Sequence, residues 1–424
     1  MSNWQQITLS DLHTHMRREV AVPPQGSRAS MSDQWVETTL GAVADWSAGG
    51  TPKATNRLFY DGGDIPWAII SDIQNGPLKE TAKRITQAGL ASIGGTKKMV
   101  PEGAVLVSMY GSVGRSAIAQ VPMATNQAIA RGVVGTQVSA EYLFLWINAH
   151  EGHLDQMARG ATQRNINKQM ITAFPIAVPP RPVQERIVEV IGAVDGQITA
   201  LEAEATALER ASRAAMSLLW RTAEGEEAES RPLSDVMHLD ILRTPMESGT
   251  KYRLAGVLNS GKGLVDKAAF DGADTEYKAM NVLRKNQVVM RKLTAWEGPI
   301  TIVPAEFDGF VASNEFPTFT LVSGIDPGWM RHVCRTPRLW AEMQSRVVGT
   351  VQRRKRLNPE QLLAVALPIP HQREQETAAE ALDAVEDQIV ALRAGVNRLR
   401  QVRAGLLSGL LGRTINIKSA ELGG

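Results

Sequence analysis

The chain has 424 residues, of which 43% are hydrophobic and 21% are charged, and its formal net charge is +2. A chain of this length can form two or three domains with separate cores, and this mildly basic balance neither requires nor excludes nucleic acid as a partner. The single cysteine, Cys334, excludes an internal disulfide and a cysteine-based zinc site, and we expect it to be a buried thiol in a reducing compartment.

Residues 1–30 form an N-terminal extension of unclear role. The segment Trp4–Leu12 (WQQITLSDL) is close to Pro232–Val236 (PLSDV), which begins a later domain, but it breaks off into charged and proline-rich sequence. It fits an extra arm, a relic of domain shuffling or a mistaken start codon. No secretory signal pattern is present, and no uncharged apolar run reaches the ~18–20 residues of a membrane helix. We therefore expect a cytoplasmic protein without a membrane partner.

Residues 31–180 are predicted to form the first globular domain. Glycine- and proline-rich turns separate short apolar runs such as Ala104–Met109, which indicates a twisted sheet with short helices, an α+β arrangement. The side chains of Gln163, Asn165 and Asn167 offer the paired donors and acceptors that match adenine N6 and N7 in the major groove. Amide-rich loops are also common as plain turns, so both interpretations stay open.

Further loops of this domain could contact DNA. Asn126 and Gln127 offer the same amide chemistry, or form a buried polar pair that fixes a loop. The segment Gly111–Arg115 (GSVGR) allows close backbone approach to a phosphate, but it lacks the Gly-Lys-Ser/Thr of a nucleotide-binding loop, so no ATP site is predicted. Trp67 and Trp296 fit core positions better than base-stacking platforms.

Residues 181–222 are predicted to form a long helix of roughly 36 residues, or ~54 Å, and residues 223–231 an exposed charged linker. Pro182 sits where a helix start tolerates it, and Gly225 lies beyond the end. Apolar residues recur in steps of three and four, which places them in one stripe along the helix. This seam consists of Ile187, Ile191, Val194, Ile198, Leu201, Ala205, Leu208, Ser212, Ala215 and Leu219.

Residues 232–369 are predicted to form a second α+β domain, with strand signals at Val288–Met290, Ile300–Val303 and Phe319–Leu321. Its densest basic run, Arg353–Arg356 (RRKR), can grip phosphates or guanine O6 and N7, or form a solvated positive loop. Lys292 could bind a phosphate near Trp296. Alternatively, Lys292 and its neighbour Arg291 could prevent an exposed edge strand from pairing with another chain.

Residues 370–412 are predicted to form a second long helix, followed by a tail at residues 413–424. Residues 370–411 match 179–220 without gaps at a shift of 191 positions, so that Gln184-Glu185 falls on Gln375-Glu376. The second seam consists of Ala378, Leu382, Val385, Ile389, Leu392, Val396, Leu399, Arg403, Leu406 and Leu410. Each helix could pack on its own domain, but the sustained seams favour pairing of the two helices as an antiparallel coiled coil.

In this arrangement the chain resembles the specificity subunits of type I restriction-modification systems. The resemblance runs from Trp35 to Gly412, and each of its motifs is weak when taken alone. In the first domain the motifs are Gly49–Lys53, Ile65–Trp67 with Asp72, Tyr110–Gly114, Asn126–Ala128 and Gly160–Gln163 with Asn165–Asn167. In the second domain they are Val289–Leu293, Trp296–Gly298, Ser313–Pro317 and Gln352–Arg356. Both domains end in the Pro-x-x-x-x-Gln-Glu start of a long helix.

The resemblance implies two α/β target-recognition domains joined by two spacer helices, each domain reading one half of a split, asymmetric DNA site. It implies double-stranded DNA, two methyltransferase subunits and restriction subunits as partners. No cofactor is expected in this chain, while S-adenosylmethionine, ATP and magnesium are expected on the partners. The candidates for DNA contact are Thr51, Lys53, Tyr110, Ser112, Arg115, Asn126, Gln127, Thr162, Gln163, Arg164, Asn165, Asn167, Lys168, Lys292, Trp296, Ser313, Asn314, Glu315, Gln352, Arg353, Arg354, Lys355 and Arg356.

The sequence lacks the motifs of the enzyme classes that such a system contains. No adenine-methyltransferase Asp/Asn-Pro-Pro-aromatic motif, glycine-rich cofactor loop, His-x-x-x-His zinc site or Asp…Glu-x-Lys nuclease cluster is present. We therefore expect a chain without a catalytic residue or a metal site. Two alternatives stay open: a stand-alone sequence-specific DNA-binding protein, and a coiled-coil scaffold that binds no DNA.

Overall fold

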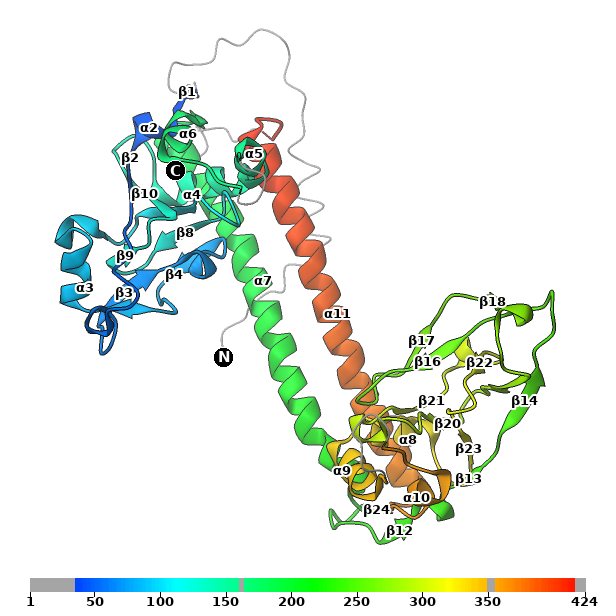
Figure 1. Cartoon of the computed structure of the whole chain (residues 1–424). Helices are drawn as coiled ribbons and strands as arrows, with labels where there is room; N and C mark the ends of the chain where they lie inside the picture. The colour runs from blue at the N-terminus through cyan, green and yellow to red at the C-terminus, as the bar shows by residue number, and fades with distance from the viewer. Residues whose placement is uncertain (1–34, 160–163, 349–354, 416–424) are drawn as a thin grey trace, which may run out of the picture. The chain divides into compact units, whose positions relative to one another are not determined.

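A computed structural model describes residues 35–159, 164–348 and 355–415 of the chain (Figure 1). It divides the chain into two compact units. The first unit holds residues 1–198 and 398–424, and the second holds residues 199–397. Each unit therefore contains one globular domain, the first part of the long helix that follows it, and the far part of the other long helix.

The first unit builds its domain from antiparallel and mixed sheets. Strand β7 (Val105–Ser108) lies at the centre of a five-stranded sheet of order β2-β10-β7-β8-β4, where all four of its residues are buried. The other strands of this sheet are β2 (Ala44–Ala48), β10 (Ile129–Val134), β8 (Ser116–Ala119) and β4 (Gly76–Leu78). A four-stranded sheet of order β5-β3-β9-β6 consists of β5 (Arg84–Ile85), β3 (Ile65–Ala68), β9 (Met123–Thr125) and β6 (Met99–Val100).

Helix α4 (Ala140–Ala149) supplies much of the core of this unit, because seven of its ten residues are buried. They pack with Leu40, with Ile187 and Ile191 of α7, and with Leu410 near the end of α11. The domain is thus fixed to both long helices by apolar contacts. The remaining short elements are β1 (Val36–Thr39), paired with β11 (Pro175–Val178), and helices α2 (Leu40–Val43), α3 (Gln87–Ser92), α5 (Glu151–Met157) and α6 (Lys168–Ala173).

The second unit repeats this plan with shorter strands. Its central sheet has the order β13-β23-β20-β21, formed by β13 (Met237–Leu239), β23 (Thr318–Leu321), β20 (Val288–Met290) and β21 (Ile300–Ile302). A three-stranded sheet holds β14 (Leu242–Pro245), β19 (Ala279–Val282) and β22 (Val311–Ala312). Three two-stranded sheets pair β12 (Ser230–Pro232) with β24 (Ala366–Pro368), β15 (Lys251–Tyr252) with β18 (Phe270–Asp271), and β16 (Ala255–Val257) with β17 (Leu264–Asp266).

Three short helices and the ends of both long helices enclose the core of the second unit. Trp329 of α8 is fully buried, and its indole Nε1 donates to the carbonyl oxygen of Leu219, beyond the end of α7. Leu382 of α11 lies in the same core. The short helices are α8 (Pro327–Val333), α9 (Pro337–Arg346) and α10 (Pro359–Leu363).

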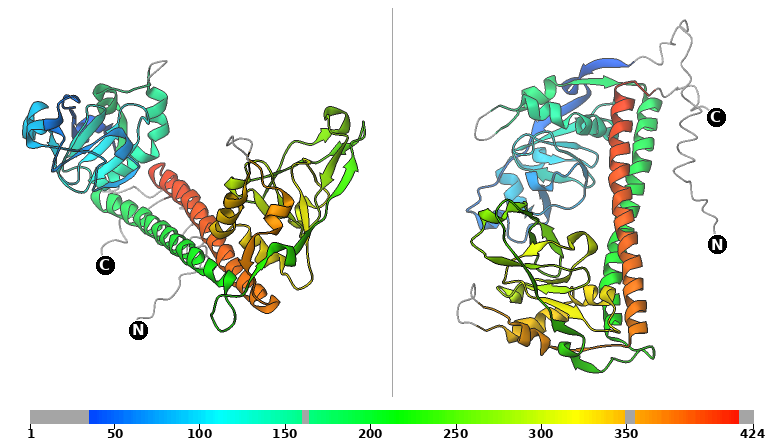
Figure 2. Two further views of the ribbon diagram at one scale, coloured as in Figure 1. Left: turned by 60° about the horizontal axis from the view of Figure 1, so that its bottom comes forward. Right: turned by 90° about the vertical axis from the view of Figure 1, so that its right-hand side faces the viewer.

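The long helices α7 (Arg181–Ala215) and α11 (Gln372–Leu411) lie side by side (Figure 2). In the first unit Arg403 donates from Nη2 to Asp195 Oδ2 across 3.0 Å, and in the second Arg393 donates from Nε to Glu209 Oε1 across 3.1 Å. The order of these partners is reversed between the helices, so the helices run antiparallel. The predicted fold class, two α/β domains joined by two long antiparallel helices, is confirmed.

Every predicted seam residue of both helices is buried or half-buried. Helix α7 ends at Ala215 and continues as a 3-10 turn over Met216–Trp220. The limits assigned above to domains, linker and tail remain a prediction. Among the described residues, none of the helices is both long and apolar enough to cross a membrane.

Candidate nucleic-acid interface

A hairpin crosses the end of the central strand β7 in the first unit. Asn165 forms β-bridges with Tyr110 and with Arg159, and the amide of Ile166 donates to the carbonyl oxygen of Met109 across 3.0 Å. Because Ile166 is buried, the closing end of the hairpin is fixed to the sheet, while Arg159 and Tyr110 are exposed. Two of the predicted candidates, Tyr110 and Asn165, therefore lie directly opposite each other.

The second unit closes a hairpin in the same way beyond β20. Arg356 forms β-bridges with Leu293 and with Val348, and the amide of Leu357 donates to the carbonyl oxygen of Lys292 across 3.1 Å. Leu357 is fully buried, as Ile166 is in the first unit. We call this shared arrangement the hairpin frame; it places Asn165 of the first unit and Arg356 of the second at equivalent positions.

A polar turn approaches each hairpin frame from a neighbouring segment. In the first unit Asn126 Oδ1 accepts from the amide of Ala128, whose carbonyl oxygen accepts from the amide of Met109. In the second unit Ser313 Oγ accepts from the amide of Glu315, whose carbonyl oxygen accepts from the amide of Lys292. The turns are equivalent, so Ala128 in the first unit corresponds to Glu315 in the second.

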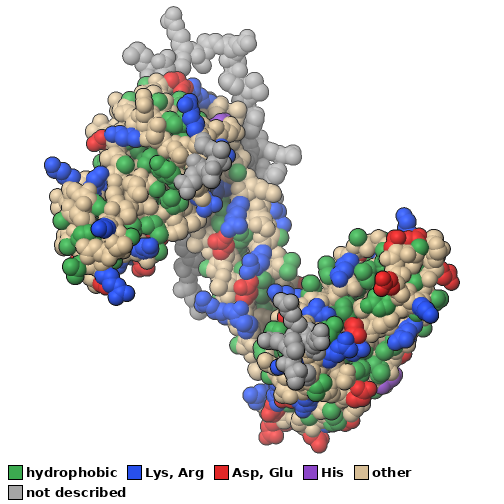
Figure 3. Space-filling model, viewed as in Figure 1, with side chains coloured by type: hydrophobic (Ala, Val, Ile, Leu, Met, Phe, Trp, Pro, Cys, Tyr) green, Lys and Arg blue, Asp and Glu red, His purple; other side chains and the backbone are tan. Residues whose placement is uncertain are grey.

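The second unit places three charged side chains on this frame. Lys292 Nζ lies 3.8 Å from Glu315 Oε2, and Arg356 Nη2 lies 3.7 Å from Glu315 Oε1. The candidates Lys292, Glu315 and Arg356 are thus brought together, although they come from three separate segments. Figure 3 shows Lys and Arg side chains interspersed with Asp and Glu on the visible face of the second domain. We call these three residues the Glu315 cluster.

Arg291 fixes the loop that carries Lys292. Its guanidinium group donates to Asn259 Oδ1 across 2.7 Å, to Thr294 Oγ1 across 2.6 Å and to Glu297 Oε2 across 3.1 Å. These contacts give Arg291 a structural role rather than the protection of an edge strand. Trp296 in the same loop is half-buried, and its indole nitrogen is covered without a hydrogen-bond partner among the described residues.

Arg115 and Arg164 of the first unit both have acidic neighbours. Arg115 Nε lies 3.8 Å from Glu151 Oε1, and Arg164 Nη1 lies 3.2 Å from Asp155 Oδ2. Ser112 is half-buried in the loop before Arg115. The charges of these two arginines are therefore partly offset within the unit, while the exposed Arg159 of the hairpin has no ion pair among the described residues.

The loop Gly49–Lys53 is held against the turn that contains Asn126. Thr51 Oγ1 donates to the side-chain oxygen of Gln127, and Trp67 Nε1 donates to the carbonyl oxygen of Gly50 across 3.0 Å. A Cβ atom at Gly49 would meet the carbonyl oxygen of Thr125 at 2.1 Å, so only glycine allows this approach. Thr51, Gln127 and the exposed Lys53 form one polar surface, and Trp67 is a core residue as predicted.

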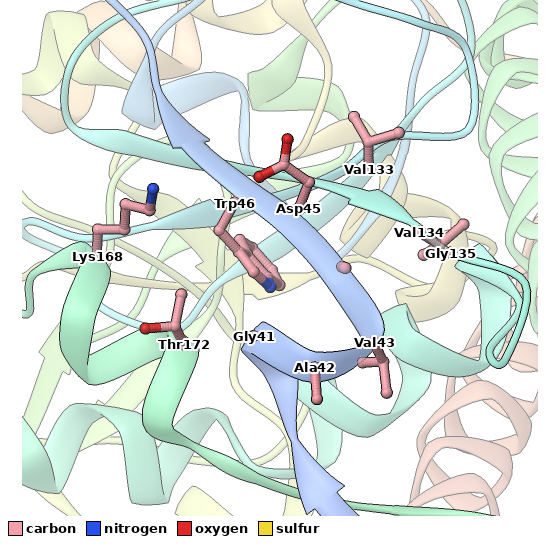
Figure 4. Close-up of a pocket in the computed structure, with 11 residues that line it drawn as sticks. Gly41, Ala42, Val43, Asp45, Trp46, Val133, Val134, Gly135, Lys168 and Thr172 are labelled. Carbon is pink, nitrogen blue, oxygen red and sulfur yellow. The ribbon is translucent and has the colours of Figure 1, made fainter.

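Asn167 and Lys168 begin helix α6. Asn167 Oδ1 accepts from the amide of Met170 across 2.9 Å and so caps the helix. Lys168 lines an open hollow of about 660 Å³ between α6, α2 and β2, in which Asp45 is the other charged residue (Figure 4). Thr172 contributes a hydroxyl group to the lining of this hollow.

The remaining candidates are Lys355, which directly precedes Arg356 of the hairpin frame, Asn314, and the residues outside the described part of the chain. Lys355 is half-buried, and its carbonyl oxygen accepts from the amide of Thr294. Asn314 donates to the carbonyl oxygen of Ala279 across 3.1 Å and has a structural role in its turn. The candidates that lie outside the described residues are Thr162, Gln163, Gln352, Arg353 and Arg354.

Sequence reasoning missed the role of two repeated glutamines. Gln184 is fully buried, accepts from the amide of Ser139 across 2.9 Å and donates to the carbonyl oxygens of Gln137 and Pro179. Gln375 accepts from the amide of Asp326 across 2.9 Å and donates to the carbonyl oxygen of Pro370. The repeated Pro-x-x-x-x-Gln pattern is thus the joint between each domain and its helix. Arg159 was also missed, since nothing in its sequence context marks it.

One group among the described residues, His332, Asp383 and Glu386, has side-chain atoms close enough together to hold a metal ion. Arg331 pairs with Asp383, and Arg335 donates to Glu386 across 2.6 Å, so arginines already neutralise both carboxylates. Burial lowers the pKa of His332 below its ordinary value, against the hydrogen bond with Asp383, which raises it. We interpret the group as an ion-pair network that joins α8 to α11.

Residues 32–210 match the family of type I restriction modification DNA specificity domains. Similar curated proteins include the specificity subunit of the type I restriction enzyme EcoR124I/EcoR124II from Escherichia coli, 26% identical over 163 residues. The specificity subunit of the MjaIX enzyme from Methanocaldococcus jannaschii is 25% identical over 186 residues. These alignments cover 37% and 39% of this chain, and 40% and 41% of the length of the two relatives.

Two solved structures share the fold over nearly the whole chain. The S subunit of a type I restriction-modification system from M. genitalium aligns with 92% of this chain and 99% of its own, with a TM-score of 0.53 and 12% identity. A chain from a structural study of the assembly of a type I restriction-modification system aligns with 91% of this chain and 99% of its own length, with a TM-score of 0.52 and 12% identity.

The first domain is therefore a DNA specificity domain by its sequence, and the duplicated frame extends its architecture to the second. Residues 32–210 thus match a type I restriction modification DNA specificity domain, and the chain as a whole shares its fold with a solved S subunit, in agreement with the resemblance found in its motifs.

Proposed function

We propose that this chain is the DNA-sequence-reading subunit of a type I restriction-modification complex and has no catalytic activity of its own. The observation that carries the proposal is the duplicated hairpin frame, which holds Asn165 in the first unit and Arg356 in the second. Contacts to base edges specify a sequence, while contacts to phosphates only position the protein. Two equal frames with different side chains suit a protein that reads two different half-sites of one asymmetric, bipartite DNA sequence.

The surfaces that would meet DNA are the hairpin frames and the loops beside them. In the first unit, Tyr110, Asn165, Thr51 and Gln127 offer hydroxyl and amide groups, the chemistry that recognises adenine or thymine edges. In the second unit, the Glu315 cluster and Lys355 offer charges. Arg353 and Arg354 continue this basic run in the sequence and remain candidates.

The partners in this proposal are double-stranded DNA, two methyltransferase subunits and restriction subunits. S-adenosylmethionine, ATP and magnesium would belong to those partners. The antiparallel helices would hold the two domains at a set distance, and that distance would determine the number of unread base pairs between the half-sites. The proposed setting is the cytoplasm, which contains the DNA.

A genome-wide map of methylated adenines tests the proposal. It compares cells that carry this chain and its neighbouring methyltransferase with cells that lack this chain alone. We expect a split, asymmetric motif that disappears with the chain. Identical maps would contradict the proposal, provided that the methyltransferase is shown to be expressed in both strains.

A further inference from the structure

The Glu315 cluster is more than a pair of surface ion pairs. The side chains of Lys292 and Glu315 are 24% and 30% exposed, and that of Arg356 is 49% exposed. The two charge contacts, at 3.8 and 3.7 Å, are both longer than the 2.7–3.2 Å of a hydrogen bond. Glu315 therefore lies between two cations without being hydrogen-bonded to either.

The two carboxylate oxygens of Glu315 differ in their surroundings. Oε2 is covered and has no hydrogen-bond partner among the described residues, and it faces the ammonium group of Lys292. Oε1 lies beside the guanidinium group of Arg356. Because Oε2 is covered, the exposed part of this side chain belongs to its other atoms. The carboxylate of Glu315 thus offers a hydrogen-bond acceptor next to the donors of the Arg356 guanidinium group. Lys292 supplies a positive charge near the other carboxylate oxygen.

The first unit shows that the hairpin frame does not need these charges. The equivalent positions there are Met109, Ala128 and Asn165, and the same backbone hydrogen bonds and bridges form around them. A carboxylate held between two cations is therefore an addition of the second unit. Oε2 of Glu315 makes no hydrogen bond among the described residues, which ordinarily costs stability, and a further role of this side chain would explain why it is kept.

We infer that Glu315 and Arg356 together select a C·G base pair in the half-site that the second domain reads. In the major groove cytosine presents its N4 amino donor, and the paired guanine presents two acceptors, O6 and N7. A carboxylate accepts from cytosine N4, and a guanidinium group can donate to both guanine atoms. An A·T pair offers a single amino donor too, but it lacks the adjacent O6 and N7 that a guanidinium grips with two bonds. This inference rests on the proposed function.

Adenine-methylation maps of cells that carry Glu315→Gln, Glu315→Ala or Arg356→Ala test this inference, with the cognate methyltransferase present. We expect one C·G position of one half-site to become degenerate, with discrimination against the other base pairs reduced about 10- to 100-fold. The other half-site should be unchanged. Competition binding by the purified complex, with DNA duplexes that carry each base pair at that position, gives the fold-change directly. The double variant Glu315→Ala/Arg356→Ala should be degenerate at this same position and at no other.

Glu306→Gln is the matched control, because it removes an exposed carboxylate from the same domain, and its motif should equal that of the natural chain. An unchanged motif in the Glu315 variants, or a uniform loss of binding without degeneracy, would overturn the inference. So would an A·T pair at the affected position. If Glu315→Ala does not fold, the isosteric Glu315→Gln decides; if that variant also fails to fold, the charge is structural and the inference is wrong. A natural chain that directs no motif would instead contradict the proposed function itself.

Discussion

At the bridge that closes each hairpin, the first domain has Asn165 and the second has Arg356. The neighbouring turn has Ala128 in the first domain and Glu315 in the second, although both turns make the same backbone hydrogen bonds. In the first domain Arg164 also has an acidic neighbour, since it contacts Asp155. The shared backbone fixes where side chains are presented, while the side chains determine the charge of the surface at each bridge.

The same contrast holds where the domains meet the helices. The first domain attaches to α7 and α11 through apolar residues such as Leu145 and Ile191. The second domain adds the ion pairs of Arg331 and Arg335 with α11. A buried glutamine is common to both joints. The joint and the hairpin frame are thus the two conserved features of the duplication, and the chemistry around each has diverged.

The glutamine joint gives the largest expected effect on stability. Gln184→Ala removes the three hydrogen bonds of a buried side chain, and Gln375→Ala removes two. We expect losses of about 2–4 kcal/mol and about 1–3 kcal/mol in the free energy of unfolding, because Ser139 and Pro179 in the first joint and Pro370 in the second stay buried and lose a partner. Chemical denaturation measures the loss, and hydrogen exchange at the amides of Ser139 and Asp326 should become faster in the matching variant.

Gln197→Ala and Gln388→Ala are the matched controls, since these glutamines form another repeated pair but are exposed on the same helices. Their effect should stay within about 0.5 kcal/mol. If the buried variants were no less stable than these controls, the joint would not depend on the glutamines.

The sequence predicted the helices well because their signal is local. A repeat without gaps and an apolar seam of constant period identify α7 and α11, and the need to bury both seams predicts that the two helices pair. The hairpin frame was harder to find. Ser139 and Asp326 are equivalent but lie 187 positions apart, whereas Asn165 and Arg356 lie 191 apart. Insertions between these points interrupt the repeat, and no residue type marks the bridges.

The candidate residues were identified by chemistry, but their grouping depends on long-range packing. Lys292, Glu315 and Arg356 come from three segments, and only the fold brings them together. Asn167 could not be recognised as a helix cap rather than a base-reading residue, because asparagine suits both roles.

The salt dependence of DNA binding should distinguish the two hairpins. Lys355 precedes Arg356 and has no ion-pair partner among the described residues, while Arg164 precedes Asn165 and contacts Asp155. We expect Lys355→Ala to reduce the slope of log K against log salt by about 1, because one phosphate contact is lost. Arg164→Ala should reduce it by less. Titrations of the methyltransferase complex at several salt concentrations measure both slopes.

Lys355→Arg should restore the slope, since it keeps the charge. Equal changes for Lys355→Ala and Arg164→Ala would show that the contact with Asp155 does not offset the charge of Arg164 when DNA is bound. The partial offset of charge inferred for Arg164 would then be wrong.

The smallest expected effect concerns pH and the joint of the second domain. His332 is buried on α8, at the position that Leu145 occupies on α4 of the first domain. Burial lowers the pKa of His332 below its ordinary value, against the raising effect of the Asp383 hydrogen bond. The unfolded chain therefore takes up this proton at a higher pH than the folded chain, and stability falls as the pH drops through about 6.5 and toward the folded pKa.

His332→Leu, which copies the first domain, should remove this part of the pH dependence, because the proton-binding group is gone while Arg331 still pairs with Asp383. Thermal melts of the variant and the natural chain between pH 5 and 8 make the comparison, with the exposed His238→Leu as the control. A natural chain that gains stability as the pH falls through this window would show that Asp383, and not burial, dominates the titration of His332. A charged histidine would then stabilise the joint of the second domain. This joint would differ from the apolar joint of the first domain by a third charged group, in addition to Arg331 and Arg335.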